Sequence, residues 1–526
     1  MRRSQALALL ALAAPGAGAK RSSPAGHPFT TALTGLGGSP IGLTPVGTPD
    51  TSTLSMVSLA STDPDAQCNG AAGGSSSGGG RRVVWLRGVA SHITLSPRSS
   101  RCFHASDGSA AAYFYAPSTA PAGSVNASTW LVYLEGSMFC WNGESCQDRA
   151  KTRPYWASST VWAPVMAQGG IFATDPAKSA FATAHRIYVK YCSSDLWSGD
   201  LPASATSPAS LTFRGARIVA AVITSLVADQ GMGSVPGSQL LFGGCSAGAI
   251  GAMNNLDAVA AQVPPTVRVR GLLDASALVD IAPTGWGWSP DLVPLQTLVA
   301  ELVAAVAPTF DDTCLARYSG SDAWKCLWGQ YRMPLLATPF FANAVQFDDF
   351  EIQYDTDNLA PHTPAQLAFV DSFQPAFLAL IRSLPPGTGV FSPTCLVHCL
   401  SGQPTFQSLL VNGVSMSSAV TAWWAGQPAA VVSGCTGWDC TAACGVTRQG
   451  LPCNMGAAGC TAITMPTETS DEPAPAGAPQ PGQAAEAVAT TEGSLTGAQQ
   501  AGLSALVAQQ QASRRVLAAA DRCCGH

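Results

Sequence analysis

Short apolar runs recur through the middle of the chain, and longer segments of helical character separate them. The runs that predict buried strands lie at 130–134, 186–189, 239–242 and, more weakly, 339–344. The segments that predict helices include 214–229 and 249–262. Because strands that alternate with helices usually form parallel sheets, we expect a mostly parallel α/β sheet flanked by helices.

Two flanking segments have a different composition. Residues 20–82 are rich in Ser, Thr, Gly and Pro, and residues 463–526 begin with a stretch of Pro, Ala, Glu and Thr and end in a weakly helical tail. Such compositions bury too little apolar surface to offset the entropy lost on ordering. We therefore expect one folded domain over 83–462, between a flexible linker at 20–82 and a low-complexity tail at 463–526.

The first nineteen residues have the pattern of a secretory signal peptide. Arg2 and Arg3 precede an apolar run at 6–14, and small residues at 17–19 offer a cleavage site. The run is shorter than the roughly 20 apolar residues that span a bilayer. The most apolar later stretch, 292–306, is interrupted by polar residues. We expect a secreted protein, in the extracellular medium or the cell wall, without a transmembrane segment.

Composition excludes some functions. Of the 526 residues 47% are hydrophobic and 11% are charged, and the net charge is −5. These values allow a sizeable core, and they lack the basic bias of a nucleic-acid-binding protein.

Seventeen cysteines are spread along the chain, which favours disulfide bonds in an exported protein. Their spacing does not give the pairing, and the odd number leaves at least one thiol unpaired within the chain. The densest run lies at 435–460, and His398 is the only histidine near it. We therefore disfavour a zinc site and expect no metal. The triplet that begins at Asn126 is a glycosylation acceptor.

A nucleophile elbow is predicted at Gly244-Cys245-Ser246-Ala247-Gly248, which fits G-x-S-x-G. It follows an apolar strand and precedes an Ala-rich helical segment, which is the arrangement found in α/β-hydrolases. Glycines on both sides allow the tight turn, and the helix N-terminus favours negative charge beside the serine. An incidental serine in a Gly-rich turn is the alternative. The context favours Ser246 as a nucleophile.

A serine nucleophile needs a base, and a third group must orient that base. In the α/β-hydrolase order the acid and then the histidine follow the serine along the chain. Three histidines do so: His362 in a Pro-rich loop, His398 between two cysteines, and His526 at the end of the chain. Elimination favours His398 as the base, although a structural histidine remains the alternative.

The sequence identifies the acid that orients the histidine less clearly than it identifies the histidine. The candidates follow the strand predicted at 339–344, where a triad acid is expected just past the strand end; they are Asp348, Asp349, Asp355 and Asp357. Asp348 is the nearest of them, and spacing alone ranks it only slightly above the others.

From about residue 83 to 460 the chain resembles the family of plant pectin acetylesterases and their animal relative Notum, which are carboxylesterases. The motifs that carry the resemblance are WLVYLEG at 130–136 with CW at 140–141, YC at 191–192 with WSGD at 197–200, FRG at 213–215, GCSAG at 244–248 with Asp257, TPFF at 338–341, FDDFEIQ at 347–353 and CLVHC at 395–399. The later A-x-x-x-W helix and the cysteine-rich C-terminal region are also similar.

The resemblance implies a triad of Ser246, Asp348 and His398. It also implies an oxyanion hole made by the backbone N–H groups of Ser137, Met138 and Ala247. Ser137 and Met138 replace the second and third glycines of the family's E-G-G-G segment. Non-glycine residues are strained at positive φ. We therefore expect the replacement of these two glycines to affect activity more than any other departure from the family's motifs.

The resemblance further implies a reaction and its partners. We expect a secreted monomer that hydrolyses O-acetyl esters of a cell-wall or extracellular polysaccharide and needs no cofactor. The alternatives are a Notum-like deacylase that removes fatty-acyl groups from a protein or lipid, and a catalytically inactive binding protein on the same fold. Small acyl groups need a shallow pocket and long chains a deep apolar one, and the sequence does not distinguish the two.

Overall fold

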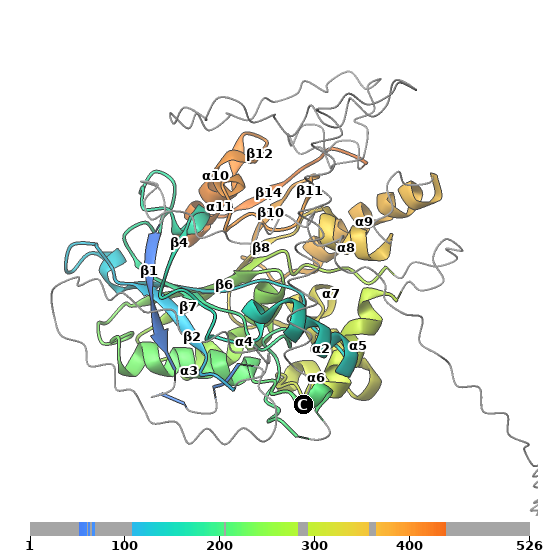
Figure 1. Cartoon of the computed structure of the whole chain (residues 1–526). Helices are drawn as coiled ribbons and strands as arrows, with labels where there is room; N and C mark the ends of the chain where they lie inside the picture. Colours follow the sequence, from blue (N-terminus) through green and yellow to red (C-terminus); the bar gives the residue numbers. More distant parts are fainter. Residues whose placement is uncertain are drawn as a thin grey trace, which may run out of the picture. The chain divides into compact units, whose positions relative to one another are not determined.

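The computed structural model describes residues 52–59, 62–63, 66–68, 108–204, 207–281, 293–356 and 364–437 (Figure 1). Within these residues a ten-stranded sheet runs in the order β14-β10-β8-β7-β6-β3-β5-β2-β1-β4. The first seven strands of this order are parallel, and the pairs that involve β2, β1 and β4 are antiparallel. The mostly parallel sheet that the sequence predicted is therefore confirmed.

The strands of the large sheet are β1 (Ser52–Ser58), β2 (Ala112–Ala116), β3 (Thr129–Leu134), β4 (Val165–Gln168), β5 (His185–Val189), β6 (Gln239–Cys245), β7 (Arg268–Asp274), β8 (Phe340–Asn343), β10 (Gly389–Ser392) and β14 (Ala430–Val432). Two small two-stranded sheets pair β9 (Phe347–Asp348) with β11 (Leu396–Val397), and β12 (Leu410–Val411) with β13 (Val414–Ser415). All four runs predicted as strands are present, as β3, β5, β6 and β8.

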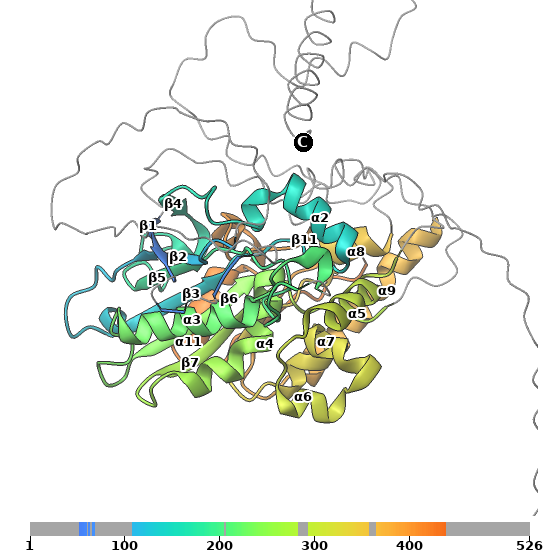
Figure 2. The ribbon, with the colours of Figure 1, turned by 60° about the horizontal axis from the view of Figure 1, so that its bottom comes forward.

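The α-helices are α2 (Gly143–Thr152), α3 (Gly215–Ala228), α4 (Ala247–Gln262), α5 (Leu295–Val306), α6 (Asp312–Arg317), α7 (Gly329–Arg332), α8 (Asp349–Asp355), α9 (Pro364–Ser383), α10 (Thr405–Ser408) and α11 (Met416–Trp424). Figure 2 shows α3 and α4 side by side along the sheet. Both helices were predicted from the sequence. None of the described helices is long and apolar enough to cross a membrane.

Helices cover both faces of the sheet, as alternate residues of β7 show. A Cβ atom added to Gly271 would lie 2.7 Å from Leu256 of α4. The neighbouring residue, Arg270, places its guanidinium over the rings of Trp423 and Trp424 of α11, at 5.4 and 5.1 Å. Because successive side chains of a strand point to opposite faces, α4 and α11 lie on opposite sides. The central strands are consequently buried on both faces, as β3 is along its whole length.

The prediction of a flexible linker over 20–82 is wrong for part of that segment. Residues Ser52–Ser58 form β1, which pairs with β2 on one side and β4 on the other. Cys68 is bonded to Cys192, 124 residues further along the chain. Within this Ser- and Thr-rich segment Ser52 and Leu54 are buried and the residues that follow each are exposed, as expected of a strand with one face on the core. The predicted signal peptide and C-terminal tail lie outside the described residues.

Disulfide bonds are a pervasive feature of the domain, as predicted. Bridges join Cys68 to Cys192, Cys140 to Cys146, Cys245 to Cys399, and Cys314 to Cys326. Cys395 and Cys435 are also disulfide-bonded, so every cysteine in the described ranges is oxidised.

Candidate active site

Ser246 lies on a sharp turn between β6 and α4, above the carboxyl end of the central strand. Its backbone has φ 57° and ψ −126°, a conformation that non-glycine residues rarely adopt. The Ser246 N–H donates to the carbonyl of Asp274 on the neighbouring strand β7, at 2.9 Å. A serine held in such a conformation between strand and helix is the geometry of a nucleophile elbow.

The glycines of the G-x-S-x-G pattern are required by close packing. A Cβ atom on Gly248 would lie 2.1 Å from the carbonyl oxygen of Leu134, and one on Gly244 would lie 2.6 Å from the same oxygen. Both contacts are with backbone of β3, which cannot move aside as a flexible side chain could. The close approach of α4 and of the end of β6 to β3 therefore requires that Gly248 and Gly244 lack side chains.

Substituting Gly248 by alanine should accordingly destabilise the fold. The added methyl group would force apart α4 and β3, and overpacking of this kind typically costs about 1–3 kcal/mol. Urea unfolding followed by tryptophan fluorescence measures the loss. The matched control is Gly434→Ala, where an added Cβ atom meets nothing within 4 Å. Equal unfolding midpoints for the two variants would contradict the packing argument.

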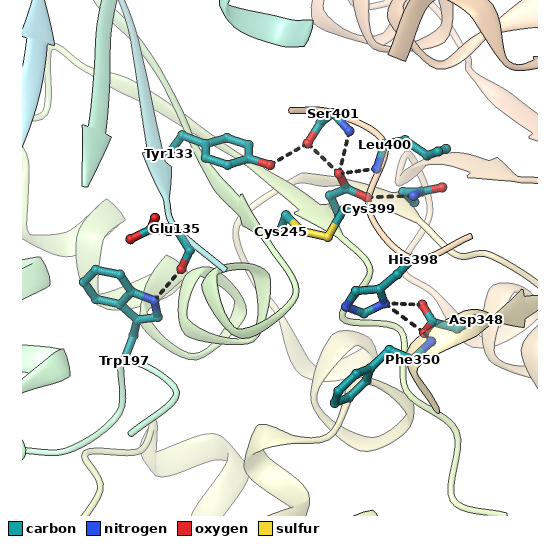
Figure 3. Close-up of a disulfide and its surroundings, with 12 residues drawn as sticks. Tyr133, Glu135, Trp197, Cys245, Asp348, Phe350, His398, Cys399, Leu400 and Ser401 are labelled. Atoms are coloured by element: carbon teal, nitrogen blue, oxygen red, sulfur yellow. Dashed lines mark hydrogen bonds and ion pairs between the residues drawn. A yellow bond between two sulfur atoms is a disulfide. The ribbon is translucent and has the colours of Figure 1, made fainter. Parts of the chain in front are cut away.

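Asp348 and His398 form a hydrogen-bonded pair at the same edge of the sheet. The short strands β9 and β11 pair in parallel, with Asp348 opposite Val397, so the next residue, His398, falls beside the carboxylate. His398 Nδ1 lies 2.8 Å from Oδ1 and 2.9 Å from Oδ2 of Asp348 (Figure 3). Because an ionised carboxylate only accepts, Nδ1 carries the proton and Nε2 of the neutral ring is an acceptor.

Asp348 is itself fixed by the start of α8. Its Oδ1 accepts hydrogen bonds from the N–H groups of Phe350 and Glu351, at 3.0 and 3.1 Å, as an N-cap residue does. The ring of Phe350 also packs against the imidazole of His398, with ring centroids 5.1 Å apart. The carboxylate thus has a fixed position before it meets the histidine.

Glu351, in the first turn of α8, is fully buried close to Asp348. Burial, followed by the charges of Asp355 and Asp348, raises the pKa of Glu351 well above its usual value. Glu351 Oε1 accepts a hydrogen bond from the N–H of Val279 at 2.9 Å, and the buried Oε2 has no hydrogen-bond partner among the described residues. Burial and the neighbouring carboxylates therefore favour the neutral form of Glu351 beside Asp348.

The charges around His398 favour its protonated form. Burial acts against the imidazolium, but the charge and hydrogen bond of Asp348, with smaller effects of Asp274 and Asp349, outweigh it and raise the pKa of His398 above 6.5. A general base must be neutral, so activity that depends on His398 is lost as the pH falls through this raised pKa.

We therefore expect kcat/KM for 4-nitrophenyl acetate to have an acidic limb with a midpoint above pH 6.5, the ordinary value for histidine. Initial rates between pH 4.5 and 9, corrected for the ionisation of 4-nitrophenol, give the midpoint. A midpoint below 6.5 would contradict the electrostatic environment described for His398.

The elbow and the histidine loop are joined covalently. A disulfide links Cys245, the residue before Ser246, to Cys399, the residue after His398, with Cα atoms 5.8 Å apart (Figure 3). The structure has no hydrogen bond between Ser246 and His398, and the buried Nε2 of His398 has no partner among the described residues. Catalytic hydrogen bonds are often long without substrate and tighten when it binds.

The loop after β3 lies directly against the elbow. A Cβ atom on Gly136 would lie 2.5 Å from the carbonyl of Cys245 and 3.2 Å from the Ser246 Cβ. Among the described residues, the N–H groups of Ser137, Met138 and Ala247 donate to no protein acceptor. Free N–H groups beside a serine are what an oxyanion hole requires.

The expected strain in this loop is absent, because neither Ser137 nor Met138 is among the residues with positive φ. A buried arginine gives Ser137 a structural role instead. Arg149 donates from Nη2 to the Ser137 hydroxyl at 3.1 Å and from Nε to the Ser194 hydroxyl at 2.9 Å. Burial lowers the pKa of Arg149 to about 10, so its guanidinium remains charged at neutral pH.

Sequence reasoning missed several residues that support this loop. Glu135 pairs with the fully buried Lys190 and accepts from the N–H of Tyr191 at 2.8 Å. The indole of Trp197 donates to the Glu135 carbonyl at 3.2 Å (Figure 3). Glu135 and Trp197 stood within recognised motifs, but nothing local to either residue indicated this contact.

Of the residues predicted for the site, the structure brings Asp348 and His398 into contact and lays the 136–138 loop on the elbow that bears Ser246. Asp349 begins α8 and Asp355 ends it, and Asp355 is fully buried. Asp357 and His362 lie outside the described residues. The glycosylation acceptor Asn126 is described, and its amide already donates to Ala180 and Thr183.

Comparison with known proteins agrees with these features. The family model described as Pectinacetylesterase matches residues 91–445, which is more than half of the chain. The palmitoleoyl-protein carboxylesterase NOTUM of Drosophila melanogaster is 30% identical over 301 residues, or 56% of this chain and 43% of that protein. The human protein of that name is 28% identical over 335 residues, or 60% of this chain and 63% of that protein.

The chain thus spans less than two thirds of the length of these curated relatives. A solved structure of the Wnt deacylase Notum from Drosophila matches with a TM-score of 0.60 and 24% sequence identity, covering 73% of this chain and 97% of that one. This likeness shows the fold, and the family match extends across the strands and loops that bear the candidate site. The chain belongs to the pectinacetylesterase family.

Proposed function

We propose that this protein is a secreted serine carboxylesterase that acts through an acyl-enzyme on Ser246. The observation that carries the proposal is the Asp348–His398 pair, covalently tied through Cys399 and Cys245 to a serine in an elbow conformation. Membership of the pectinacetylesterase family and the carboxylesterase names of the relatives support the same reaction class.

In the proposed mechanism His398 Nε2 takes the proton of Ser246 as its oxygen attacks the ester carbonyl. The N–H groups of Ser137, Met138 and Ala247 bind the oxyanion that forms. The tetrahedral intermediate collapses, and the alcohol leaves with the proton from His398. Water, activated by the same imidazole, then releases the acid and restores the serine. Asp348 holds the imidazole in the required tautomer and stabilises its charged form.

The substrate we propose is an O-acetyl ester of a cell-wall or extracellular polysaccharide, on the basis of the family. A fatty-acyl ester on a protein is the second candidate, because the relatives are named palmitoleoyl-protein carboxylesterases. Export is supported by the oxidised state of every described cysteine, since disulfides persist in oxidising compartments.

Hydrolysis of 4-nitrophenyl acetate and 4-nitrophenyl octanoate by the purified chain tests the proposal. We expect the acetate to have the higher kcat/KM, and acetate to be released from acetylated pectin. A preference for octanoate with no release from pectin would favour the fatty-acyl candidate. A folded protein that hydrolyses neither ester would favour an inactive binding protein on the same fold.

A further inference from the structure

Asp274, the last residue of β7, is fully buried, and four hydrogen bonds converge on its carboxylate. Oδ1 accepts from the Asn343 amide at 2.7 Å. Oδ2 accepts from the N–H groups of Leu400 and Ser401, at 3.0 and 2.6 Å, and from the Ser401 hydroxyl at 2.5 Å. All four partners are donors, which suits an ionised carboxylate and not an amide.

The same residue contacts the elbow through its backbone. Asp274 lies opposite Cys245 in the β6–β7 pairing, and its carbonyl accepts the N–H of Ser246 at 2.9 Å. Its side chain holds the residues that begin two positions after His398. Asp274 therefore binds the nucleophile elbow through its backbone carbonyl and the histidine loop through its side-chain carboxylate.

The hydrogen-bond network extends to the strand that leads into the oxyanion loop. The Tyr133 hydroxyl lies 2.8 Å from the Ser401 Oγ, which in turn donates to Asp274 (Figure 3). Tyr133 is on β3, three residues before Gly136. The disulfide between Cys245 and Cys399 lies beside the same carboxylate, and the two sulfurs are bonded to each other and so are not free as metal ligands.

We infer that Asp274 is a positioning residue, which holds the His398 loop against the Ser246 elbow and places a buried negative charge behind the imidazole. The inference rests on the proposed esterase function, although its effect on His398 is measurable without it. The charge of Asp274 is one of three, with Asp348 and Asp349, that raise the pKa of His398. Burial raises the pKa of Asp274 itself, and its four hydrogen bonds oppose that effect.

Asp274→Asn is the variant that tests the inference, because it keeps the shape of the side chain, removes the charge and turns one acceptor oxygen into a donor. We expect kcat to fall about 10²-fold, as for other small misplacements of a catalytic group, with KM unchanged because Asp274 does not touch substrate. We also expect the acidic limb of the pH profile to move to lower pH. The control, Asp312→Asn on the exposed start of α6, should change neither value.

The titration of His398 by NMR gives a readout independent of activity, with its signal among the seven histidines assigned from a His398→Gln variant. A lower pKa in folded Asp274→Asn is the expected result. A wild-type titration curve, or a wild-type kcat, would overturn the inference. If the unaltered protein hydrolyses no ester, the proposed function fails, and the NMR titration still decides whether Asp274 acts on His398.

If Asp274→Asn does not fold, Ser401→Ala tests the positioning role of Asp274 instead. It removes one hydrogen bond to the carboxylate, together with the contact to the Tyr133 hydroxyl, and leaves the charge and the two N–H donors in place. We expect kcat to fall about tenfold, the effect of one lost hydrogen bond to a charged group, and the His398 titration to stay close to wild type. An unchanged kcat in Ser401→Ala would overturn the positioning role.

Discussion

Ser246→Ala is expected to reduce ester hydrolysis by about 10⁴–10⁶-fold, the range seen when a serine nucleophile is removed from a triad. The elbow conformation places the Ser246 side chain beside the loop at Gly136, where an added Cβ atom would lie 3.2 Å from the Ser246 Cβ. The rate of 4-nitrophenol release from the acetate ester measures the loss, and circular dichroism and thermal unfolding report whether the variant is folded.

The control for this variant is Ser234→Ala, an equivalent change at an exposed serine between α3 and β6, which should leave the rate unaltered. Ser246→Gly provides a second check. Because glycine adopts positive φ without steric cost, it should unfold at a higher temperature than Ser246→Ala, by an amount that corresponds to about 1 kcal/mol. Residual activity in Ser246→Ala above one hundredth of wild type would contradict a nucleophilic role.

Asp348→Asn is expected to lower kcat about 10⁴-fold while the protein remains folded. The Asn amide can donate to Nδ1 of His398, which moves the ring proton to Nε2 and leaves no acceptor for the serine proton. The cap of α8 survives, since asparagine is as good an N-cap residue as aspartate. Steady-state kinetics with 4-nitrophenyl acetate measures the change.

Two further variants separate the chemical and structural roles of Asp348. Asp349→Asn alters the neighbouring acid, whose charge has a smaller effect on His398 than that of Asp348, and should change kcat only slightly. Asp348→Ala removes both the pair and the cap, so it should lose about 1 kcal/mol of stability in addition to the activity. A larger loss of activity in Asp349→Asn than in Asp348→Asn would show that Asp348 is not the triad acid.

The elbow could be predicted from sequence because its parts are contiguous. An apolar run, the G-x-S-x-G pattern and an Ala-rich segment follow one another over 239–262, and the structure has β6, the turn and α4 there. The parallel sheet was predictable for the same reason, since β3, β5 and β6 are buried strands with few polar residues. Only the family resemblance singled out Asp348 among its neighbours.

Other parts depend on contacts between distant segments. The strands β9 and β11 have two residues each, so they carry no periodicity, yet their pairing sets Asp348 opposite Val397 and so brings the next residue, His398, beside the carboxylate. The disulfide between Cys245 and Cys399 spans 154 residues, and the cysteine spacing does not reveal it. Asp274 ends β7, where nothing in the neighbouring sequence distinguishes a buried hydrogen-bonding centre from an ordinary strand end.

The conformation of the 136–138 loop was also beyond sequence analysis. Comparison with a glycine-rich motif led us to expect strain at Ser137 and Met138, but their backbone avoids positive φ. The contact that accounts for Ser137 comes from Arg149 on α2, a helix capped by Asn142 and bonded to the loop through Cys140 and Cys146. The position of Arg149 beside Ser137 depends on how the chain folds, so the sequence of the loop alone does not reveal it.

The most direct test of a serine esterase centred on Ser246 is covalent labelling with a fluorophosphonate, followed by mass spectrometry of the digested protein. We predict one phosphonyl group per chain, located on Ser246, with hydrolysis of 4-nitrophenyl acetate lost in proportion to labelling. Hydrolysis that persists in the fully labelled protein, or a label on another residue that abolishes it, would contradict the assignment of Ser246 as the nucleophile.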